Sequence, residues 1–403
     1  MKKTRFGLFL SGMLLSAGVL VFGTAFSPEA STPRPSAAVV ADSASAPSSP
    51  TPLPTRWGDW QAWGDMGDGT YRNPILPSDY SDLDCIRVGD DYYAISSTMQ
   101  FSPGMIILHS KDLVNWTLIG HAVADVTQIG PDMNWDRMNR YGKGVWAGAI
   151  HHANGRFWVV FGAPDEGFFI TSAEDPAGPW EPLHPLMLER GWDDCCIFWD
   201  DDGQAYFIGT HFADGYKTYI WKMTPDGRSL IEDTRTLINQ GAGREANKLY
   251  KINGWYYHFF SEVSQGARVA MMQRSRSIMG PYTQRRQLTD RNREWNEPNQ
   301  GGIVDTSSGE WYFITHHGTG DWEGRCMSLL PVTWIDGWPI LGATSTERRR
   351  EHGFTMGACT TGRSRSPSWP DRHNGRQQHQ PRPFAGAAFF FSRRHNSAIM
   401  TAV

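Results

Sequence analysis

Cysteine is scarce in this chain of 403 residues, and neither sign of charge dominates it. Its five cysteines are too few and too irregularly spaced for a disulfide scaffold, and no Cys-X-X-Cys pair joins a second Cys or His pair to indicate zinc. The formal net charge of −4 gives no electrostatic reason to bind nucleic acid. These shortages argue against a disulfide-stapled domain, a zinc-scaffolded domain and a nucleic-acid-binding protein.

Helical periodicity is also nearly absent. After Thr55, no stretch keeps apolar residues at the i, i+3, i+4, i+7 spacing of an amphipathic helix for three turns. Aromatic residues, in contrast, are plentiful, with 18 Trp, 13 Tyr and 20 Phe. Aromatic side chains favour β-strands and also suit a site that stacks sugar rings. The sequence therefore predicts an all-β protein.

The N-terminal segment, residues 1–25, has the pattern of a secretory signal peptide. Basic residues precede an apolar stretch that contains small residues, and cleavage after Ala25 fits the pattern. An uncleaved anchor is the alternative, because about 20 apolar residues can also span a bilayer. Both alternatives predict a secreted or periplasmic protein, membrane-anchored in the second case. Residues 26–56 are rich in Ser, Pro and Ala and are predicted to form a disordered linker.

One short pattern, a turn dipeptide followed by an aromatic and β-branched strand, recurs five times in residues 57–342. The copies are GDDYYAISS, NGRFWVVFG, DGQAYFIGT, NGWYYHFFS and SGEWYFITH. Such patterns are typical of β-hairpins. Their glycines lie 48 to 66 residues apart, as expected when each repeat is a four-stranded propeller blade. We therefore predict a five-bladed β-propeller, with a β-sandwich of similar hairpins as the alternative.

Three carboxylates precede equivalent turns. Asp82, Asp194 and Glu245 lie seven or eight residues before the turn of the first, third and fourth repeats. If the repeats superpose, these offsets place the three side chains at the same inner edge of their blades, facing one pocket. Asp79 and Asp84 flank Asp82 and are the alternatives to it.

Six segments, in order, resemble glycoside hydrolase family 43, the five-bladed propellers that act on xylose- and arabinose-containing plant polysaccharides. The segments are NPILPSDYSDLDCIRVGDDYY, HSKDLVNW, GWDDCCIFWDDDGQAY, EANKLYKINGWYY, QGGIVDT and PVTWIDGWPI. Six ordered matches are far more specific than any single short motif.

The resemblance implies an inverting glycosidase in which Asp82 is the general base that activates water and Glu245 is the general acid. It makes Asp194 the residue that tunes the pKa of the acid and orients it. Inversion needs two carboxyl groups about 6.5–9.5 Å apart, so that water fits between the base and the sugar. Asp193 is the alternative to Asp194, because a one-residue slip turns a strand side chain to the other face.

The resemblance also implies substrate-binding residues. Met99 stands where the family has an aromatic residue below the sugar, and Phe101 follows two residues later. Trp146 is expected to form a wall of the pocket, and Asn299 precedes the Gln of QGGIVDT, where the family often has His. Arg325 matches an arginine that contacts sugar hydroxyls. Since Met is a softer platform than an aromatic ring, the first subsite is expected to depart from the family's shape.

The implied chemistry requires no cofactor. Such propellers often hold a structural cation, such as calcium, in the central channel, and His316 is the candidate ligand. A histidine on a strand is, however, more often packed and hydrogen-bonded than metal-bound.

The expected substrate is a xylo- or arabino-oligosaccharide, with no nucleic-acid partner and no membrane contact beyond the possible anchor. The sequence thus predicts an exported β-xylosidase or α-L-arabinofuranosidase; an endo-arabinanase and a non-catalytic carbohydrate-binding propeller are the alternatives. Many relatives continue into a β-sandwich, which residues 343–403 do not resemble. We expect these residues to form an irregular tail, either disordered or translated out of frame.

Overall fold

The computed structural model describes residues 64–67, 69–137, 139–289, 300–317 and 324–342. The predicted signal peptide, the linker, Asn299 and the tail lie outside these residues. The chain divides into two units at Thr55 and Arg56, and every described residue belongs to the second unit. Within the described ranges, no helix is long and apolar enough to cross a membrane.

The described strands form five antiparallel sheets, each built from four consecutive strands. Blade I contains β1 (Asp84–Val88), β2 (Asp91–Ser96), β3 (Gly104–Ser110) and β4 (Trp116–Val123). Blade II contains β5 (Gly148–Ala153), β6 (Arg156–Ala163), β7 (Gly167–Ala173) and β8 (His184–Met187). Blade III contains β9 (Trp192–Trp199), β10 (Ala205–His211), β11 (Lys217–Met223) and β12 (Leu230–Gln240).

Blade IV contains β13 (Glu245–Ile252), β14 (Trp255–Ser264), β15 (Ala267–Ser275) and β16 (Gln284–Gln287). Blade V contains β17 (Gly301–Asp305), β18 (Trp311–His317), β19 (Cys326–Ile335) and β20 (Trp338–Leu341). Three short 3-10 helices are also described, η2 (Val126–Gln128), η3 (Pro131–Met133) and η4 (Phe212–Asp214).

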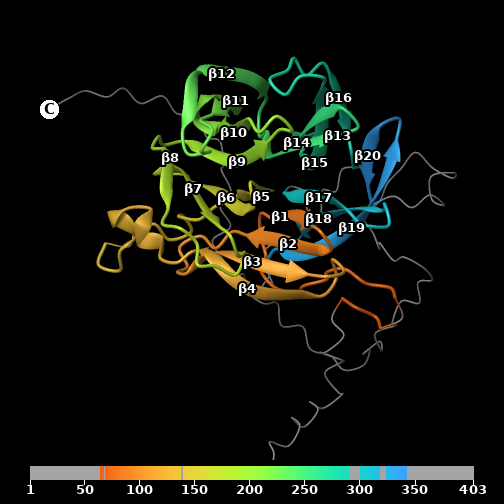
Figure 1. Ribbon diagram of the computed structural model, residues 1–403, viewed down its shortest axis with the longest axis horizontal. Helices are drawn as coiled ribbons and strands as arrows, with labels where there is room; N and C mark the ends of the chain where they lie inside the picture. Colours follow the sequence, from red (N-terminus) through yellow and green to blue (C-terminus); the bar gives the residue numbers. More distant parts are fainter. Residues whose placement is uncertain (1–63, 68, 138, 290–299, 318–323, 343–403) are drawn as a thin grey trace, which may run out of the picture. The chain divides into compact units, whose positions relative to one another are not determined.

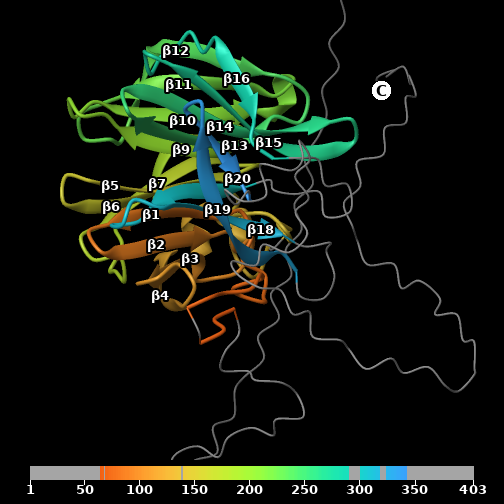
Figure 2. The ribbon, with the colours of Figure 1, turned by 90° about the vertical axis from the view of Figure 1, so that its right-hand side faces the viewer.

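The five sheets are arranged as a propeller, which confirms the predicted fold. The first strand of each blade lies toward the centre, and β4, β8, β12, β16 and β20 lie on the outside (Figures 1 and 2). The first strands β1, β5, β9 and β13 contact one another in this order, and β17 contacts β1. The Ile303 N–H of β17 donates to the Tyr250 hydroxyl of β13 at 3.0 Å, which links the last two blades and closes the ring. Side chains at the starts of these strands can therefore converge.

The predicted turn dipeptides join the first and second strands of their blades. Asn154 and Gly155 connect β5 to β6, and Asn253 and Gly254 connect β13 to β14. In both pairs the two φ angles are positive, 54° and 71° in the first and 50° and 72° in the second. Two central residues with positive φ match the twist of a tight hairpin, and Asn-Gly tolerates them best. The repeated pattern in the sequence is thus the inner hairpin of each blade.

The segment before β1 is fixed to the last blade. The side-chain amide of Asn73 accepts the Leu329 N–H at 2.8 Å and donates to the Leu329 carbonyl at 2.9 Å. The Ile75 N–H donates to the Met327 carbonyl at 2.8 Å. Asp82 lies between this segment and β1, so that its backbone is held from both sides.

The apolar core lies between neighbouring blades. One buried cluster joins Ile107 of blade I to Val159 of blade II, and another joins Phe259 of blade IV to Phe313 of blade V. Each blade buries both faces in this way, which explains the high aromatic content. The four described cysteines are buried and form no disulfide, in keeping with the sequence interpretation.

Candidate active site

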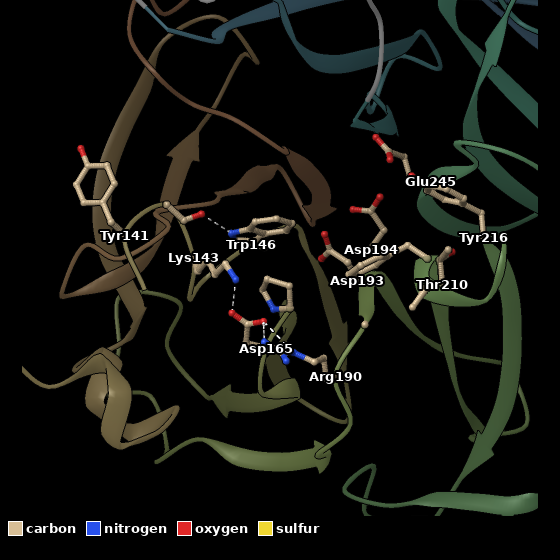
Figure 3. Close-up of a pocket in the computed structure, with 15 residues that line it drawn as sticks. Tyr141, Lys143, Trp146, Asp165, Arg190, Asp193, Asp194, Thr210, Tyr216 and Glu245 are labelled. Carbon is tan, nitrogen blue, oxygen red and sulfur yellow. Dashed lines mark hydrogen bonds and ion pairs between the residues drawn. The ribbon is translucent and has the colours of Figure 1, made fainter. Parts of the chain in front are cut away.

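A cavity of about 960 Å³ lies beside the first strands of blades III and IV. Asp193, Asp194 and Glu245 line one part of it, and Trp146 and Tyr141 line another. Figure 3 shows the three carboxyl groups close together, on the side of the cavity away from Tyr141. Three neighbouring carboxyl groups in one cavity are the arrangement from which acid–base chemistry is built.

The backbone at the start of β13 aims Glu245. The pairing of β13 with β14 is irregular between Glu245 and Lys248, and Ala246 has a left-handed φ of 70°. Such a bulge redirects the side chain beside it. It also turns the Ala246 N–H toward Asp194, whose Oδ2 accepts this hydrogen bond at 2.7 Å. One local irregularity therefore places the Glu245 side chain and binds the neighbouring carboxylate.

Asp194 lies in an equally unusual backbone conformation, with a φ of 50°. Its Oδ2 accepts the Ala246 N–H, and its Oδ1 accepts a hydrogen bond from the side-chain amide of Gln300. Burial, followed by the charge of Glu245, raises the pKa of Asp194, although the Ala246 hydrogen bond opposes the change. Asp194 and Glu245 are thus close enough for their charges to act on each other.

Arg268, on β15, forms an ion pair with Glu245, with 3.0 Å between the Arg268 Nη2 and the Glu245 Oε1. The guanidinium group also donates to the Gly243 carbonyl and the Ser261 hydroxyl, which hold it in place. Glu245 thus has a positively charged partner on β15 as well as the carboxyl group of Asp194 beside it. The sequence analysis missed Arg268, because no motif marks it.

Asp82 precedes β1, is 8% exposed and has a φ of 54°. Its Oδ1 lies 2.9 Å from the Arg325 Nη1, and its backbone N–H donates to the His316 Nδ1 at 2.9 Å. Burial opposes ionisation, but the surrounding groups, the positive charge of Arg325 first among them, outweigh it, so the pKa of Asp82 lies below its ordinary value. Asp82 is therefore ionised at neutral pH, as a general base must be.

Asp82 is not among the residues that line the cavity, but its charge acts on Asp193 and Asp194. Of the three carboxylates that the sequence analysis selected, Asp194 and Glu245 line the cavity from the first strands of blades III and IV, and Asp82 lies outside its lining, at the entrance to blade I.

The alternatives to Asp82 lie in environments unsuited to a base. Asp79 is exposed, and its Oδ1 accepts the Arg325 N–H at 3.1 Å. Asp84 is buried, and its two oxygens accept the N–H groups of Cys85 and Ile150, each at 3.0 Å. A carboxylate with both oxygens occupied by backbone donors inside the propeller is poorly placed to activate water.

Asp193, the alternative to Asp194, also lines the cavity, although strand alternation would turn it to the opposite face. The pairing of β9 with β10 is irregular here, since Asp193 pairs with Thr210 and Cys196 with Ile208. Its buried Oδ1 has no hydrogen-bond partner among the described residues. Burial, followed by the charge of Asp194, raises the pKa of Asp193 well above its ordinary value. Burial and the neighbouring charge thus favour the neutral form of Asp193.

The predicted wall and platform residues lie next to each other in the backbone. Met99 and Val145 exchange two backbone hydrogen bonds of 2.9 Å, which places Met99 beside Trp146 in the fold. Trp146 lines the cavity, and its indole N–H donates to the Gly142 carbonyl at 2.9 Å. Met99 itself is not among the lining residues.

The other predicted substrate-binding residues do not line the cavity. Phe101 is 66% exposed and lies outside the lining. Arg325 pairs with Asp82, so its guanidinium group is partly used before any sugar binds. Asn299 lies outside the described residues.

A charged wall on blade II was not anticipated from the sequence. Asp165 accepts hydrogen bonds from Lys143 and from Arg190, the latter at 2.6 Å, and all three residues line the cavity. Figure 3 shows this group below Trp146. The two cationic side chains come from different loops, so no local motif could have revealed them.

His316, the candidate metal ligand, contacts Asp82. Its Nδ1 accepts the Asp82 N–H, so that this nitrogen is already occupied. Among the described residues, no group of three or more His, Cys, Asp or Glu side chains could hold a metal ion. The predicted cation at His316 therefore stays a prediction, and we derive no step through one.

The ion pair between Arg325 and Asp82 predicts a pH effect. Replacing Arg325 with Gln removes a positive charge that stabilises the ionised base, so the pKa of Asp82 rises. A general base acts in its ionised form, so with Asp82 in the role that the resemblance implies, the acidic limb of the kcat/KM profile should move to higher pH. Arg325→Lys keeps the charge and should move the limb less. If both variants show the wild-type limb, Arg325 does not set the ionisation of the base.

Comparison with known proteins relates this site to one family. The model of glycosyl hydrolases family 43 matches residues 71–339. A beta-xylosidase of Formosa agariphila is 35% identical over 311 residues, which cover 70% of this chain and 52% of that protein. A non-reducing end alpha-L-arabinofuranosidase of Bacteroides ovatus is 31% identical over 304 residues, which cover 71% of this chain and 56% of that protein.

Solved structures show the same likeness. A bifunctional GH43-CE protein of Bacteroides eggerthii superposes with a TM-score of 0.58 and 31% identity, over 68% of this chain and 35% of that one. The chain spans about half the length of the curated relatives it matches. The family match covers nearly all of the described propeller, from before β1 into β20. The chain belongs to glycosyl hydrolase family 43.

Proposed function

We propose that this chain hydrolyses β-xylosides or α-L-arabinofuranosides by a single displacement that inverts the anomeric centre. The observation that carries the proposal is that Asp194 and Glu245 line one cavity, while the charge of a third carboxylate, Asp82, whose pKa lies below its ordinary value, acts on Asp194. The substrate class follows from relatives described as a beta-xylosidase and an alpha-L-arabinofuranosidase.

Asp82 takes a proton from water as the water oxygen attacks the anomeric carbon. Its lowered pKa suits this role, because a base must be ionised before the reaction. The His316 ring accepts the Asp82 backbone N–H and so fixes the left-handed conformation from which the side chain projects. Arg325 holds one carboxylate oxygen, which leaves the other for water.

Glu245 donates a proton to the glycosidic oxygen as the bond between that oxygen and the anomeric carbon breaks. Asp194 and Glu245 line the same cavity, and two neighbouring carboxylates resist being ionised together, which leaves one proton in the pair for donation. The proton that Asp82 gains returns to solvent, and Glu245 is reprotonated from it. The reaction thus consumes one water and restores both carboxyl groups.

Export of the chain is also a proposal, and it rests on the signal-like pattern of residues 1–25 alone.

The stereochemistry of the first product tests the mechanism. Proton NMR recorded during hydrolysis of a β-xyloside should show α-xylose before mutarotation, because inversion exchanges the anomeric configuration. Early β-xylose would indicate retention and would contradict a single displacement. Parallel assays with an α-L-arabinofuranoside decide which sugar is preferred. Release from neither substrate, together with binding of the oligosaccharide, would favour a non-catalytic carbohydrate-binding propeller.

A further inference from the structure

Lys248 is a buried cation among the first strands of the propeller. It lies on β13, three residues after Glu245, and is only 2% exposed. An ammonium group is costly to remove from water unless oxygen atoms and opposite charges surround it. The contacts of the Lys248 ammonium group therefore indicate its role in the structure.

The Lys248 ammonium group joins three blades. It donates to the Gly148 carbonyl at 3.1 Å, to the Asn247 carbonyl at 3.2 Å and to the Gln300 Oε1 at 3.4 Å. Gly148 begins β5, Asn247 belongs to β13, and Gln300 directly precedes β17. The group thus links the first strands of blades II, IV and V.

The charge of Lys248 also reaches the acidic cluster. It favours the ionised forms of Asp82, Asp84 and Asp194. Burial raises the pKa of Asp84 to about 6, and Lys248 is the largest influence that opposes this increase. Lys248 is therefore a positive charge shared among buried carboxyl groups, two of which belong to the proposed reaction.

Gln300 connects Lys248 to Asp194. It is 2% exposed, and its backbone carbonyl accepts the Thr315 hydroxyl at 2.7 Å, which fixes its position. An amide has one accepting oxygen and one donating nitrogen. Because the Oε1 faces the ammonium group of Lys248, the Nε2 faces the Oδ1 of Asp194 and donates to it. The opposite amide orientation would place an oxygen against a carboxylate.

We propose that Lys248 is a positioning residue for the hydrolysis, because its ammonium group fixes the Gln300 amide in the orientation that donates to Asp194. This inference rests on the proposed function. It assigns to Lys248 no contact with the substrate. Its role is to keep Asp194 hydrogen-bonded from Gln300 on one oxygen and from Ala246 on the other.

The variant Lys248→Met keeps the length of the side chain and removes its charge and its donors. We expect kcat to fall about tenfold or more. This is the scale of loss in metal enzymes when a residue that orients a metal-binding side chain is removed, and Lys248 orients a side chain of the site in the same indirect way. KM should change little, because Lys248 does not line the cavity. Lys251→Met is the matched control, since Lys251 lies on the same strand but pairs with Asp200 and Asp201 away from the cavity.

A double-mutant cycle tests whether Lys248 acts through Gln300. Gln300→Leu removes the amide while leaving the two carbonyl acceptors of Lys248 in place. If the amide transmits the effect, Lys248→Met should lower kcat less in the Gln300→Leu background than in the wild type. Equal losses in both backgrounds would overturn the proposal.

A titration of Asp194 provides a readout that needs no turnover. Carbon-13 NMR of labelled aspartate carboxyl groups, with the signal assigned by Asp194→Asn, should show a higher titration midpoint in Lys248→Met and in Gln300→Leu. The sign follows because each variant removes something that stabilises the ionised carboxylate. An unchanged midpoint in both variants would refute the proposal.

The two proposals fail in different ways. A wild-type protein without hydrolytic activity would end the proposed function, while the titration of both single variants and of the double variant would still test the link from Lys248 through Gln300 to Asp194. If Lys248→Met raised the midpoint equally with and without the Gln300 amide, the effect would be that of direct charge and the link would be overturned. Thermal melting shows whether Lys248→Met folds. If Lys248→Met does not fold, Gln300→Leu alone must show the lower kcat and the raised titration midpoint of Asp194. A wild-type kcat and a wild-type midpoint in Gln300→Leu would overturn the inference.

Discussion

Replacing Glu245 with Ala is expected to lower kcat for a xylo- or arabino-oligosaccharide by about 10²–10⁴-fold, the usual contribution of a general acid. Without protonation, a sugar must depart as an alkoxide, which is a poor leaving group. Loss of the acid should therefore have its full effect on kcat with such substrates. An aryl glycoside with an acidic phenol needs less protonation and should lose less activity. Steady-state kinetics on both substrates measure the difference, and the dependence on the leaving group identifies the step that Glu245 serves.

Glu262→Ala is the matched control for this experiment. Glu262 lies on the neighbouring strand β14, pairs with Arg244 at 2.9 Å and does not line the cavity. It should therefore retain nearly wild-type kcat on both substrates. A Glu245→Ala protein that loses the same factor on aryl and sugar leaving groups would show that Glu245 supports the site without donating the proton.

The positions of the three carboxylates could be predicted because the inner hairpin of each blade has a nearly constant length. A turn dipeptide is visible in the sequence, and counting back from it reaches the start of the first strand. Asp82 lies two residues before β1, Asp194 is the third residue of β9, and Glu245 begins β13. The number of residues between a carboxylate and the turn dipeptide therefore indicates that the carboxylate lies near the start of the first strand, whichever residues lie between them.

The conformations that aim these side chains could not be predicted. Asp82, Asp194 and Ala246 all have left-handed backbone, which residues other than Gly rarely adopt. Simple alternation would place Asp193 and Asp194 on opposite faces of β9, yet both line the cavity. Bulges depend on how a strand pairs with its neighbouring strands, so they cannot be predicted from the sequence of one strand alone.

The partners of the carboxylates were equally hidden. Arg268 reaches Glu245 from β15, and Gln300 reaches Asp194 from the segment before β17. A lone arginine or glutamine is by default predicted to be an exposed surface residue. Its partner can be identified only when the arrangement of the blades is known. The resemblance placed Arg325 near the sugar, but only the fold shows that it first pairs with Asp82.

Replacing Asp82 with Asn should have an effect as large as the loss of Glu245 but with a different signature. The amide keeps the shape of the carboxyl group and cannot accept the proton from water, so kcat should fall by about 10²–10⁴-fold. Because activation of water is needed whatever departs, aryl and sugar leaving groups should be affected alike. Kinetics on the two substrates, compared with those of Glu245→Ala, separate the base from the acid.

Asp79→Asn is the matched control for the base, because Asp79 is exposed and lies on the same segment. Its carboxylate accepts the Arg325 N–H, a contact that an amide oxygen can also make. It should keep activity near that of the wild type. If Asp79→Asn or Asp84→Asn abolished hydrolysis while Asp82→Asn did not, the base would be the wrong aspartate, and the left-handed turn held by His316 would have only a structural role.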